Sequence, residues 1–219
     1  MLELAVKTLL AYLLGSVAGA LALGQLLGFD IRHEGSGNAG ATNALRTRGA
    51  RFAAGTLLID LGKGWVACVL VPLLPWPAFD ASLPRSWLAV ACAGAVVVGH
   101  VYPVWYGFRG GQGAATLLGA LAGLCAGYVL PVLAVWLGVL WLTGYVGLAT
   151  MLAAASFLLF ILAGASLLPG YPAPAELPAL TAFGALATAF TVYTHRANIN
   201  RMLAGTENRA RRFVRKGAR

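Results

Sequence analysis

The fold is decided by a long uncharged tract at residues 114–168, which reads AATLLGALAGLCAGYVLPVLAVWLGVLWLTGYVGLATMLAAASFLLFILAGASLL. A membrane-crossing helix needs about 20 mostly apolar residues. The tract has 55 residues, so it is too long for one crossing. No soluble core needs so much continuous apolar sequence, and the tract therefore indicates an integral membrane protein made of helices.

The two ends of this tract are predicted to lie on opposite sides of the membrane. It begins just after a loop that carries Arg109, and a Pro-rich segment with Glu176 and no cation follows it at 169–178. Loops rich in Lys and Arg stay in the cytoplasm, so the Pro-rich segment is external and an odd number of crossings connects the two. Three crossings of about 18 residues fit the hydrocarbon thickness. The breaks are predicted near Gly127–Pro131 and Thr143–Gly147, where Gly and Pro weaken helical continuity.

Four further apolar segments bring the predicted number of membrane helices to seven. They are residues 4–27, 52–74, 87–106 and 179–194. We therefore predict an all-α membrane protein, a seven-transmembrane-helix bundle with a periplasmic N-terminus and a cytoplasmic C-terminus. Residues 1–219 form a single integral membrane domain in this prediction, multi-pass in the bacterial inner membrane. Close helix approach is predicted at Gly15, Gly19, Gly94, Gly119 and Gly123.

The composition agrees with a membrane protein and argues against a nucleic-acid binder. The chain is 59% hydrophobic and 11% charged. Its net charge of +9 is not spread over a soluble surface, because the cations cluster in short loops. These clusters contain Arg32, Arg46, Arg48 and Arg51, then Arg109, and then eight Lys and Arg between Arg196 and Arg219. The positive-inside rule predicts that all three clusters are cytoplasmic, and the basic tail, 208–219, is predicted to meet anionic lipid.

Two opposite charges, Asp60 and Lys63, lie inside the second apolar segment, where isolated charges are costly. Their i, i+3 spacing permits a mutual ion pair, which we favour over the alternative of a contact to a polar loop. Cys68, Cys92 and Cys125 lie in apolar stretches without the spacing of metal ligands. They are predicted to pack between helices, and no metal site is expected.

The first predicted cytoplasmic loop, residues 30–51, has the composition of an anion-binding site. Backbone N–H groups of a glycine-rich loop can point at one phosphate, and the N-terminus of a following helix adds its dipole. An arginine can then hold phosphate oxygens in bidentate fashion. A plain turn is the alternative, and the loop is no P-loop because the Gly-Lys-Ser/Thr ending is missing. The candidate residues are Gly35, Ser36, Gly37, Asn38, Gly40, Thr42, Asn43 and Arg46.

The second loop, residues 107–113, repeats this pattern directly before the 114–168 tract. It contains Arg109, Gly110, Gly111, Gln112 and Gly113. Glycines that precede a helix beside a cation predict a second phosphate or acyl-phosphate cradle, with a simple helix turn as the alternative. His100 lies nearer the membrane, and we interpret it as a packed or hydrogen-bonded histidine.

The third polar segment, residues 195–207, begins where the last apolar segment ends. If it is helical, His195, Asn198 and Met202 share one face by their i, i+3 and i+7 spacing. The side chains of His195 and Asn198 are then expected to project together.

Together these segments resemble the motifs of the PlsY family, the acyl-phosphate-dependent glycerol-3-phosphate acyltransferases. The resemblance is carried by GSGNAGATNALRTRG at 35–49, GHVYPVWYGFRGGQGAAT at 99–116, HRANINRMLAGTE at 195–207 and DLGKG at 60–64. It covers the chain in the family's order and implies a seven-helix bundle with a cytoplasmic active site. It also implies transfer of a fatty acyl group from acyl phosphate to the 1-hydroxyl of sn-glycerol 3-phosphate, which gives lysophosphatidate and phosphate in phospholipid biosynthesis.

The resemblance also assigns roles to residues. It implies catalytic roles for Ser36, His195 and Asn198. It implies substrate-binding roles for Gly35, Gly37, Asn38, Gly40, Thr42, Asn43, Arg46, Arg109, Gly110, Gly111, Gln112 and Gly113. Gln112 stands where the family has Lys, and a neutral amide keeps hydrogen-bond donors but loses the charge.

The partners that the resemblance implies are the two substrates and membrane lipid, with functional coupling to a soluble acyl-phosphate synthase. It implies no metal, no cofactor and no CoA thioester. The oligomeric state is left open.

The chemistry of such a transfer is undemanding at the leaving group, because phosphate departs readily. The enzyme mainly has to hold two anions together against their repulsion. His195 is predicted either to accept the alcohol proton or to orient the substrate, and a phosphate oxygen is the alternative base. None of the three histidines, His33, His100 and His195, has an Asp five positions later, which argues against the His/Asp dyad of CoA-dependent acyltransferases.

The sequence also leaves open two functions other than that of an enzyme. One is an anion transporter or channel that uses Asp60, Lys63 and the glycine-rich helix ends as its pathway. The other is a non-catalytic lipid-binding or assembly protein, which the neutral Gln112 makes more plausible.

Overall fold

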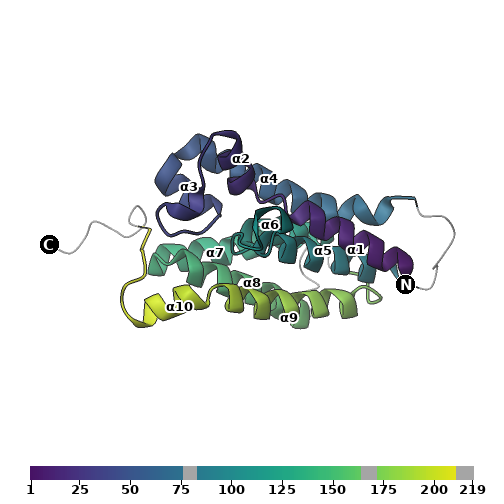
Figure 1. Cartoon of the computed structure of the whole chain (residues 1–219). Helices are drawn as coiled ribbons and strands as arrows, with labels where there is room; N and C mark the ends of the chain where they lie inside the picture. The colour runs from purple at the N-terminus through teal and green to yellow at the C-terminus, as the bar shows by residue number, and fades with distance from the viewer. Residues whose placement is uncertain (76–82, 164–171, 211–219) are drawn as a thin grey trace. The chain divides into compact units, whose positions relative to one another are not determined.

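The computed structural model of the chain describes residues 1–75, 83–163 and 172–210, and within these ranges it contains helices and no strand (Figure 1). The all-α prediction is confirmed for these residues. Residues 169–171 of the predicted Pro-rich segment and residues 211–219 of the basic tail lie outside the described residues. The chain divides into two compact units, Met1–Ala126 and Gly127–Arg219. That residues 1–219 form a single domain stays a prediction.

The first unit is a bundle of apolar helices with two polar loops. Its elements are α1 (Leu2–Gly15), α2 (Gly19–Leu26), η1 (Ile31–His33), α3 (Ala41–Arg48), α4 (Ala50–Val69), η2 (Val71–Leu73), α5 (Arg85–Val101), η3 (Val104–Tyr106) and α6 (Ala114–Leu124). Helix α4 packs along α6, and α1 packs along α5.

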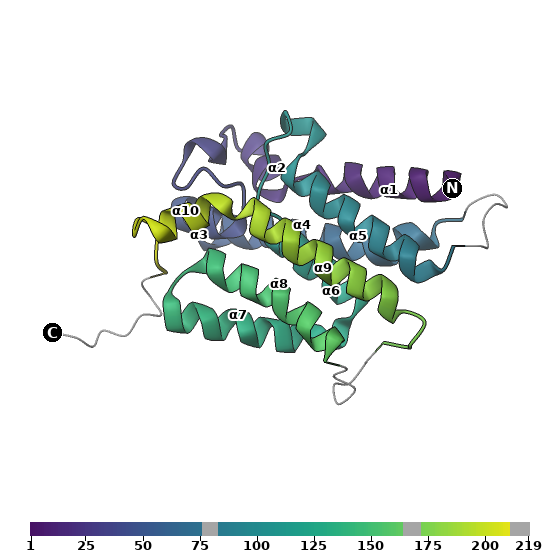
Figure 2. The ribbon, with the colours of Figure 1, turned by 90° about the horizontal axis from the view of Figure 1, so that it is seen from below.

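The second unit is an antiparallel set of helices in which α8 packs against both α7 and α9 (Figure 2). Its elements are α7 (Val129–Thr143), α8 (Val146–Leu162), α9 (Leu177–Thr194) and α10 (Arg196–Leu203), with the short η4 (Ala126–Tyr128) before α7. The ring of Phe157 on α8 meets Tyr128 edge-on, with 5.6 Å between centroids, and also contacts Phe183 on α9. These aromatic contacts join the three helices at one end.

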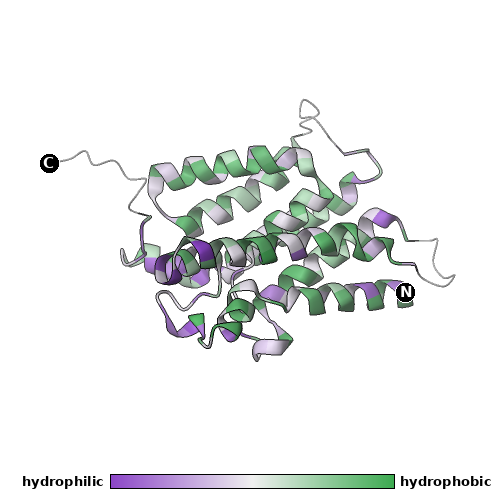
Figure 3. Cartoon of the chain, turned by 90° about the horizontal axis from the view of Figure 1, so that it is seen from above, coloured by the Kyte–Doolittle hydropathy of each residue, from purple (hydrophilic) through white to green (hydrophobic). Residues whose placement is uncertain are grey.

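The described helices suit a membrane, as Figure 3 shows by the predominantly hydrophobic colour of the long ones. By length and hydropathy, four segments can cross a bilayer: Ala50–Leu73, Arg85–Tyr106, Ala126–Thr143 and Leu177–Thr194. A fifth crossing results if α1 and α2 form one bent span. Helix α6 has 11 residues, or about 16 Å at 1.5 Å per residue, and α8 has 17. The predicted count of seven crossings and the orientation of the termini therefore stay predictions.

The breaks inside the 114–168 tract were predicted with different accuracy. The second break is formed by Gly144 and Tyr145, inside the predicted range 143–147. Gly144 supplies the left-handed C-cap that ends α7. The first break begins earlier than predicted, at Cys125, and α7 already starts at Val129. Pro131 does not interrupt α7, because proline is tolerated in the first helical turn, where the N–H has no partner anyway.

The segment predicted as one helix over residues 4–27 is broken, since α1 and α2 meet at an angle of 51°. Polar groups of α4 satisfy the freed backbone at the break. The Lys63 ammonium donates to the carbonyl oxygens of Gly15 and Val17 at 2.9 Å each, and the Gly19 N–H donates to Asp60 Oδ1 at 3.0 Å. A broken helix in lipid is tolerated when neighbouring groups satisfy its free donors and acceptors in this way.

Small residues set the helix crossings of the first unit. A Cβ on Gly64 of α4 would come within 2.8 Å of the backbone nitrogen of Ala120 on α6, and a Cβ on Gly119 would overlap the backbone of Leu61. Such close backbone approach is the usual packing of helices in lipid. Gly94 does not take part, since nothing lies within 4 Å of its Cβ position.

Candidate active site

The first glycine-rich loop is held in shape by Asn43, which is 1% exposed. Its amide nitrogen donates to the carbonyl oxygen of Glu34 at 2.9 Å, and its Oδ1 accepts the N–H of Ser36 at 2.9 Å. Gly35 has a φ of +56° and lies directly against the Asn43 amide, so a side chain does not fit there. The structure thus gives Asn43, predicted to line the phosphate site, a role in supporting the loop.

Three other side chains of this loop remain available to a ligand. The hydroxyls of Ser36 and Thr42 and the guanidinium of Arg46 form no side-chain hydrogen bond or ion pair with the described residues. Thr42 and Arg46 are four residues apart on α3 and therefore share a face. Helix α3 begins after Gly40 without a side-chain cap, so its first N–H groups are also free to bind an anion. The predicted following helix is confirmed.

The second loop also leads into an uncapped helix N-terminus. Gly113 precedes α6 with a φ of +86°, which favours glycine. The N–H groups of Gly110 and Gly111 donate to the carbonyl oxygens of Val101 and His100 at 3.0 and 3.2 Å. These two glycines therefore shape the loop, and the donors left for an anion are those of the first turn of α6.

The structure brings these two loops together. The Asn38 amide donates to Gln112 Oε1 at 3.0 Å. A Cβ on Gly111 would come within 2.9 Å of the carbonyl oxygen of Ala39, which shows how closely the two backbones approach. The starts of α3 and α6 follow this contact within a few residues, so two helix N-termini without side-chain caps begin near it.

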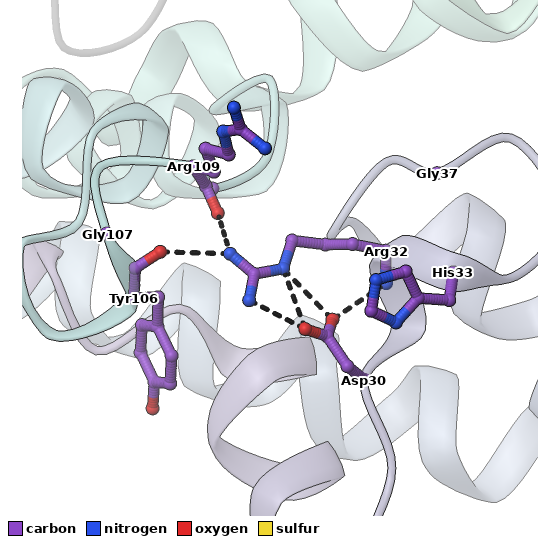
Figure 4. Close-up of a pocket in the computed structure, with 8 residues that line it drawn as sticks. Asp30, Arg32, His33, Gly37, Tyr106, Gly107 and Arg109 are labelled. Carbon is purple, nitrogen blue, oxygen red and sulfur yellow. Dashed lines mark hydrogen bonds and ion pairs between the residues drawn. The ribbon is translucent and has the colours of Figure 1, made fainter.

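The Asp30–Arg32 ion pair, which the sequence did not predict, connects the same two loops. The Arg32 guanidinium forms a bidentate pair with Asp30, with contacts of 2.6 to 3.0 Å, and also donates to the carbonyl oxygens of Tyr106 and Arg109 (Figure 4). These hydrogen bonds hold the pKa of the Asp30 carboxyl below its usual value. The Asp-x-Arg spacing at 30–32 was the available signal, but it does not reveal the carbonyl partners.

A pocket of about 560 Å³ opens beside the Asp30–Arg32 ion pair (Figure 4). It is lined by this ion pair and by residues of both predicted loops, namely Asp30, Arg32, His33, Gly37, Tyr106, Gly107, Arg109 and Gly110. The guanidinium of Arg109 points away from the Asp30–Arg32 pair, so its charge is not neutralised there (Figure 4).

The charges inside the second apolar segment form the ion pair that was predicted. Lys63 Nζ lies 2.9 Å from Asp60 Oδ1, and both side chains are buried. His100 joins them, with Nδ1 at 3.2 Å from the same carboxylate oxygen. The interpretation of His100 as a hydrogen-bonded, packed histidine is confirmed.

The third motif lies in the second unit, and its helix is confirmed as α10. His195 caps this helix and is 3% exposed, with Nδ1 at 2.8 Å from the carbonyl oxygen of Thr191. Burial lowers the pKa of the His195 imidazole below its ordinary value. The Asn198 amide donates to Glu207 Oε1 at 2.8 Å, and Arg201 pairs with the other carboxylate oxygen of Glu207. That His195 and Asn198 join the two loops of the first unit stays a prediction.

Comparison with known proteins places the chain in a family. A model of the family described as glycerol-3-phosphate acyltransferase matches residues 5–205. A glycerol-3-phosphate acyltransferase of Aquifex aeolicus is 37% identical over 199 residues, which cover 91% of this chain and 95% of the relative. One from Brucella anthropi is 41% identical and covers 90% of this chain and 89% of the relative.

Solved structures agree with this result. The crystal structure of PlsY, an integral membrane glycerol 3-phosphate acyltransferase, in its glycerol 3-phosphate form aligns with a TM-score of 0.79 at 33% identity, over 94% of each chain. Its lysophosphatidic acid form aligns with a TM-score of 0.77. The sequence, the fold and the paired loops thus lead to one conclusion: the chain belongs to the PlsY family of integral membrane glycerol-3-phosphate acyltransferases.

Proposed function

We propose that this acyltransferase uses acyl phosphate as its donor and transfers the fatty acyl group to the 1-hydroxyl of sn-glycerol 3-phosphate. The observation that carries the proposal is the contact between Asn38 and Gln112, because it joins the two loops that lead into the uncapped N-termini of α3 and α6. Each helix end can bind one phosphate group. A donor and an acceptor that both carry phosphate match this pair of sites better than a donor with a neutral thioester at its reacting end.

Ser36, Thr42 and Arg46 are the proposed ligands at the first helix end, with Asn38 and the backbone of Gly35, Gly37 and Gly40. Arg46 would supply the positive charge that the helix dipole alone cannot match. At the second helix end, Gly110, Gly111 and Gly113 shape the turn, and Arg109 and Gln112 are its proposed polar side chains. Asn43 takes part by holding the first loop.

In the proposed reaction the 1-hydroxyl oxygen attacks the acyl carbonyl carbon, and the bond from that carbon to the phosphate oxygen breaks. The products are lysophosphatidate and phosphate, and the hydroxyl proton ends on the released phosphate or in solvent. Because the leaving group is good, catalysis depends on placing the two anions at reacting distance.

His195 is the proposed acceptor of the hydroxyl proton, and Asn198 is the second proposed catalytic residue of this motif, through hydrogen bonds and not as a proton carrier. A carbonyl oxygen only accepts hydrogen bonds, so the contact with Thr191 supports a proton on Nδ1. In the neutral ring Nε2 is then the accepting nitrogen, as a base requires. Burial favours this neutral form. His195 can pass the proton on to the departing phosphate.

We also propose seven membrane crossings, a periplasmic N-terminus, a cytoplasmic C-terminus and a cytoplasmic active site in the bacterial inner membrane. The cation-rich loops around Arg46, Arg109 and Arg201 support this orientation. A soluble enzyme that makes acyl phosphate would then deliver the donor from the cytoplasm. The anion transporter and the non-catalytic lipid-binding protein are both less consistent with membership in an acyltransferase family.

The test is a direct assay of the purified full-length chain in detergent. Acyl phosphates of several chain lengths are supplied with labelled glycerol 3-phosphate in the presence of a metal chelator, and acyl-CoA replaces acyl phosphate in parallel reactions. Labelled lysophosphatidate is expected from acyl phosphate alone. Product from acyl-CoA but not from acyl phosphate, with folded protein verified, would contradict the proposed donor.

A further inference from the structure

His100 connects the buried ion pair of α4 with the second glycine loop. On one side its Nδ1 lies 2.9 Å from Lys63 Nζ and 3.2 Å from Asp60 Oδ1. On the other side its carbonyl oxygen accepts the N–H of Gly111 at 3.2 Å. The nearest atom to a Cβ built on Gly111 is His100 Nε2, so the ring itself faces the loop.

The two partners of Nδ1 fix the orientation of this ring. The Lys63 ammonium has three protons, and three oxygens surround it at 2.9 Å: the carbonyls of Gly15 and Val17 and Asp60 Oδ1. An unprotonated Nδ1 on His100 would accept from this ammonium 2.9 Å away, and a protonated Nδ1 would donate to the Asp60 carboxylate oxygen 3.2 Å away. Nδ1 has a partner in either tautomer, so Asp60 and Lys63 together fix the orientation of the ring.

Nε2 of the neutral ring therefore faces the loop. A second proton on the ring would make it a cation beside the Lys63 ammonium, and like charges at this distance repel strongly in a buried site. The space at this point allows no adjustment, because Gly111 lies between the ring and the carbonyl oxygen of Ala39. A Cβ on Gly110 would likewise come within 2.7 Å of Pro103.

We propose that His100 is a positioning residue for acyl transfer. Asp60 and Lys63 hold its ring in one orientation, and the ring and carbonyl of His100 together fix the turn from Gly110 to Gln112. This turn sets the start of α6 against the first loop. The inference rests on the proposed function of the turn as part of a phosphate site.

The test compares three variants of the full-length protein in detergent. In His100→Asn the amide nitrogen takes the place of Nδ1 and can still donate to Asp60, but no atom remains at the position of Nε2. In His100→Gln an amide oxygen can reach the position of Nε2. Cys92→Ala is the matched control, because Cys92 is fully buried on the same helix, eight residues before His100, and is remote from the glycine loop.

Amide hydrogen exchange of the peptide that covers residues 107–116 is the main readout, since it needs no substrate. Exchange there is expected to be about tenfold faster in His100→Asn, near wild type in Cys92→Ala, and intermediate in His100→Gln. The kcat/KM for acyl transfer should fall about tenfold in His100→Asn and recover partly in His100→Gln, while Cys92→Ala stays within about twofold of wild type.

Unchanged exchange of this peptide in His100→Asn would overturn the proposal, as would faster exchange spread evenly over all spans, which marks a merely structural role. Should His100→Asn yield no folded protein, Asp60→Asn takes its place, because it removes the carboxylate that contacts Nδ1 while an amide of the same size remains, and unchanged loop exchange there has the same meaning. If the wild-type protein shows no acyl transfer, the proposed function fails, and the exchange data still decide the role of His100.

Discussion

Arg46 and Arg48 lie two residues apart on α3 but have different surroundings. Arg48 pairs with Glu34 and lies over the ring of Phe29, with 3.7 Å from its guanidinium carbon to the ring centroid. Arg46 has no such partner among the described residues. Arg46→Ala should therefore reduce kcat/KM for glycerol 3-phosphate by roughly 10- to 100-fold, the value of a lost charge-assisted hydrogen bond. Arg48→Ala, the control, should stay within about twofold. Equal kinetics of the two variants would remove Arg46 from the site.

Gln112 also permits a sharp test, because its oxygen accepts a hydrogen bond from Asn38. Lysine at this position cannot accept, so the Asn38 amide has to turn and offer its own oxygen. Gln112→Lys adds a positive charge beside the start of α6. The KM of one phosphorylated substrate should fall about three- to tenfold. Initial-rate kinetics with each substrate varied in turn measure the change, and two unchanged KM values would mean that the charge is dispensable.

The pH dependence of transfer should report His195. Its pKa lies below the ordinary value of 6.5, so the ring is neutral at pH 7 and gains a proton only as the pH falls through the lowered value. Activity should therefore persist below pH 6.5 and then decline. Phosphate groups of the substrates also titrate near pH 6, to about the same extent in any variant. The pH–rate profile of the wild type is therefore compared with that of His195→Asn, which shows the substrate titration alone. An identical acid limb in that variant would exclude His195 as the proton acceptor.

The lowered pKa of His195 also makes the free energy of unfolding depend on pH, in the same direction as the activity. Because the folded-state pKa of His195 is depressed, the stability contributed by its neutral form is present above the unfolded-state pKa and is lost as the pH falls through the folded-state value.

The sequence predicted which loops carry polar side chains, but not the direction in which each side chain points. Thr42 and Asn43 are neighbours of similar polarity, yet the first is available to a ligand and the second is buried in the loop that it supports. The partners of Asn43 lie up to twelve residues away, and the carbonyl partners of Arg32 lie more than seventy residues away. Such contacts form only when the chain folds, so the residue types alone cannot separate ligand from support.

At the scale of helices, two glycines of α4 test the packing against α6. A Cβ on Gly64 would meet the backbone of Thr116 and Ala120, whereas nothing lies within 4 Å of a Cβ on Gly62. Gly64→Ala must push the two backbones apart and should cost about 1–3 kcal/mol or more. Gly62→Ala should be neutral or stabilise the helix by up to about 1 kcal/mol. Thermal unfolding in detergent measures both, and equal midpoints would contradict the packing described here.

Helix boundaries were predictable where a local signal marks them and not elsewhere. Gly144 marks the end of α7, and the break there was predicted correctly. The break between α1 and α2 has no proline and no charge in the sequence Ser16-Val17-Ala18. It depends on Lys63 and Asp60, more than forty residues away, and the apolar run alone therefore indicated one continuous helix.

For the whole molecule, the proposed orientation can be tested by labelling in intact cells. The three native cysteines are free but buried, so the background reaction with a membrane-impermeant maleimide should be low. Leu2→Cys is expected to react from outside, because residue 2 is 65% exposed at the proposed periplasmic end. Gly205→Cys should react only after permeabilisation. Labelling of residue 205 in intact cells would mean that the bundle is inverted or threaded differently.

The position of Lys63 has a consequence for the energetics of the protein in its membrane. In many transporters the free carbonyl oxygens of an interrupted helix coordinate a sodium ion. This ion can bind and dissociate, and it thereby couples transport to the sodium gradient. Here the carbonyl oxygens of Gly15 and Val17 accept hydrogen bonds from the Lys63 ammonium, which is covalently attached and cannot diffuse away. These carbonyl oxygens are therefore satisfied permanently, and the helix break offers no site at which a sodium gradient could be coupled to the protein.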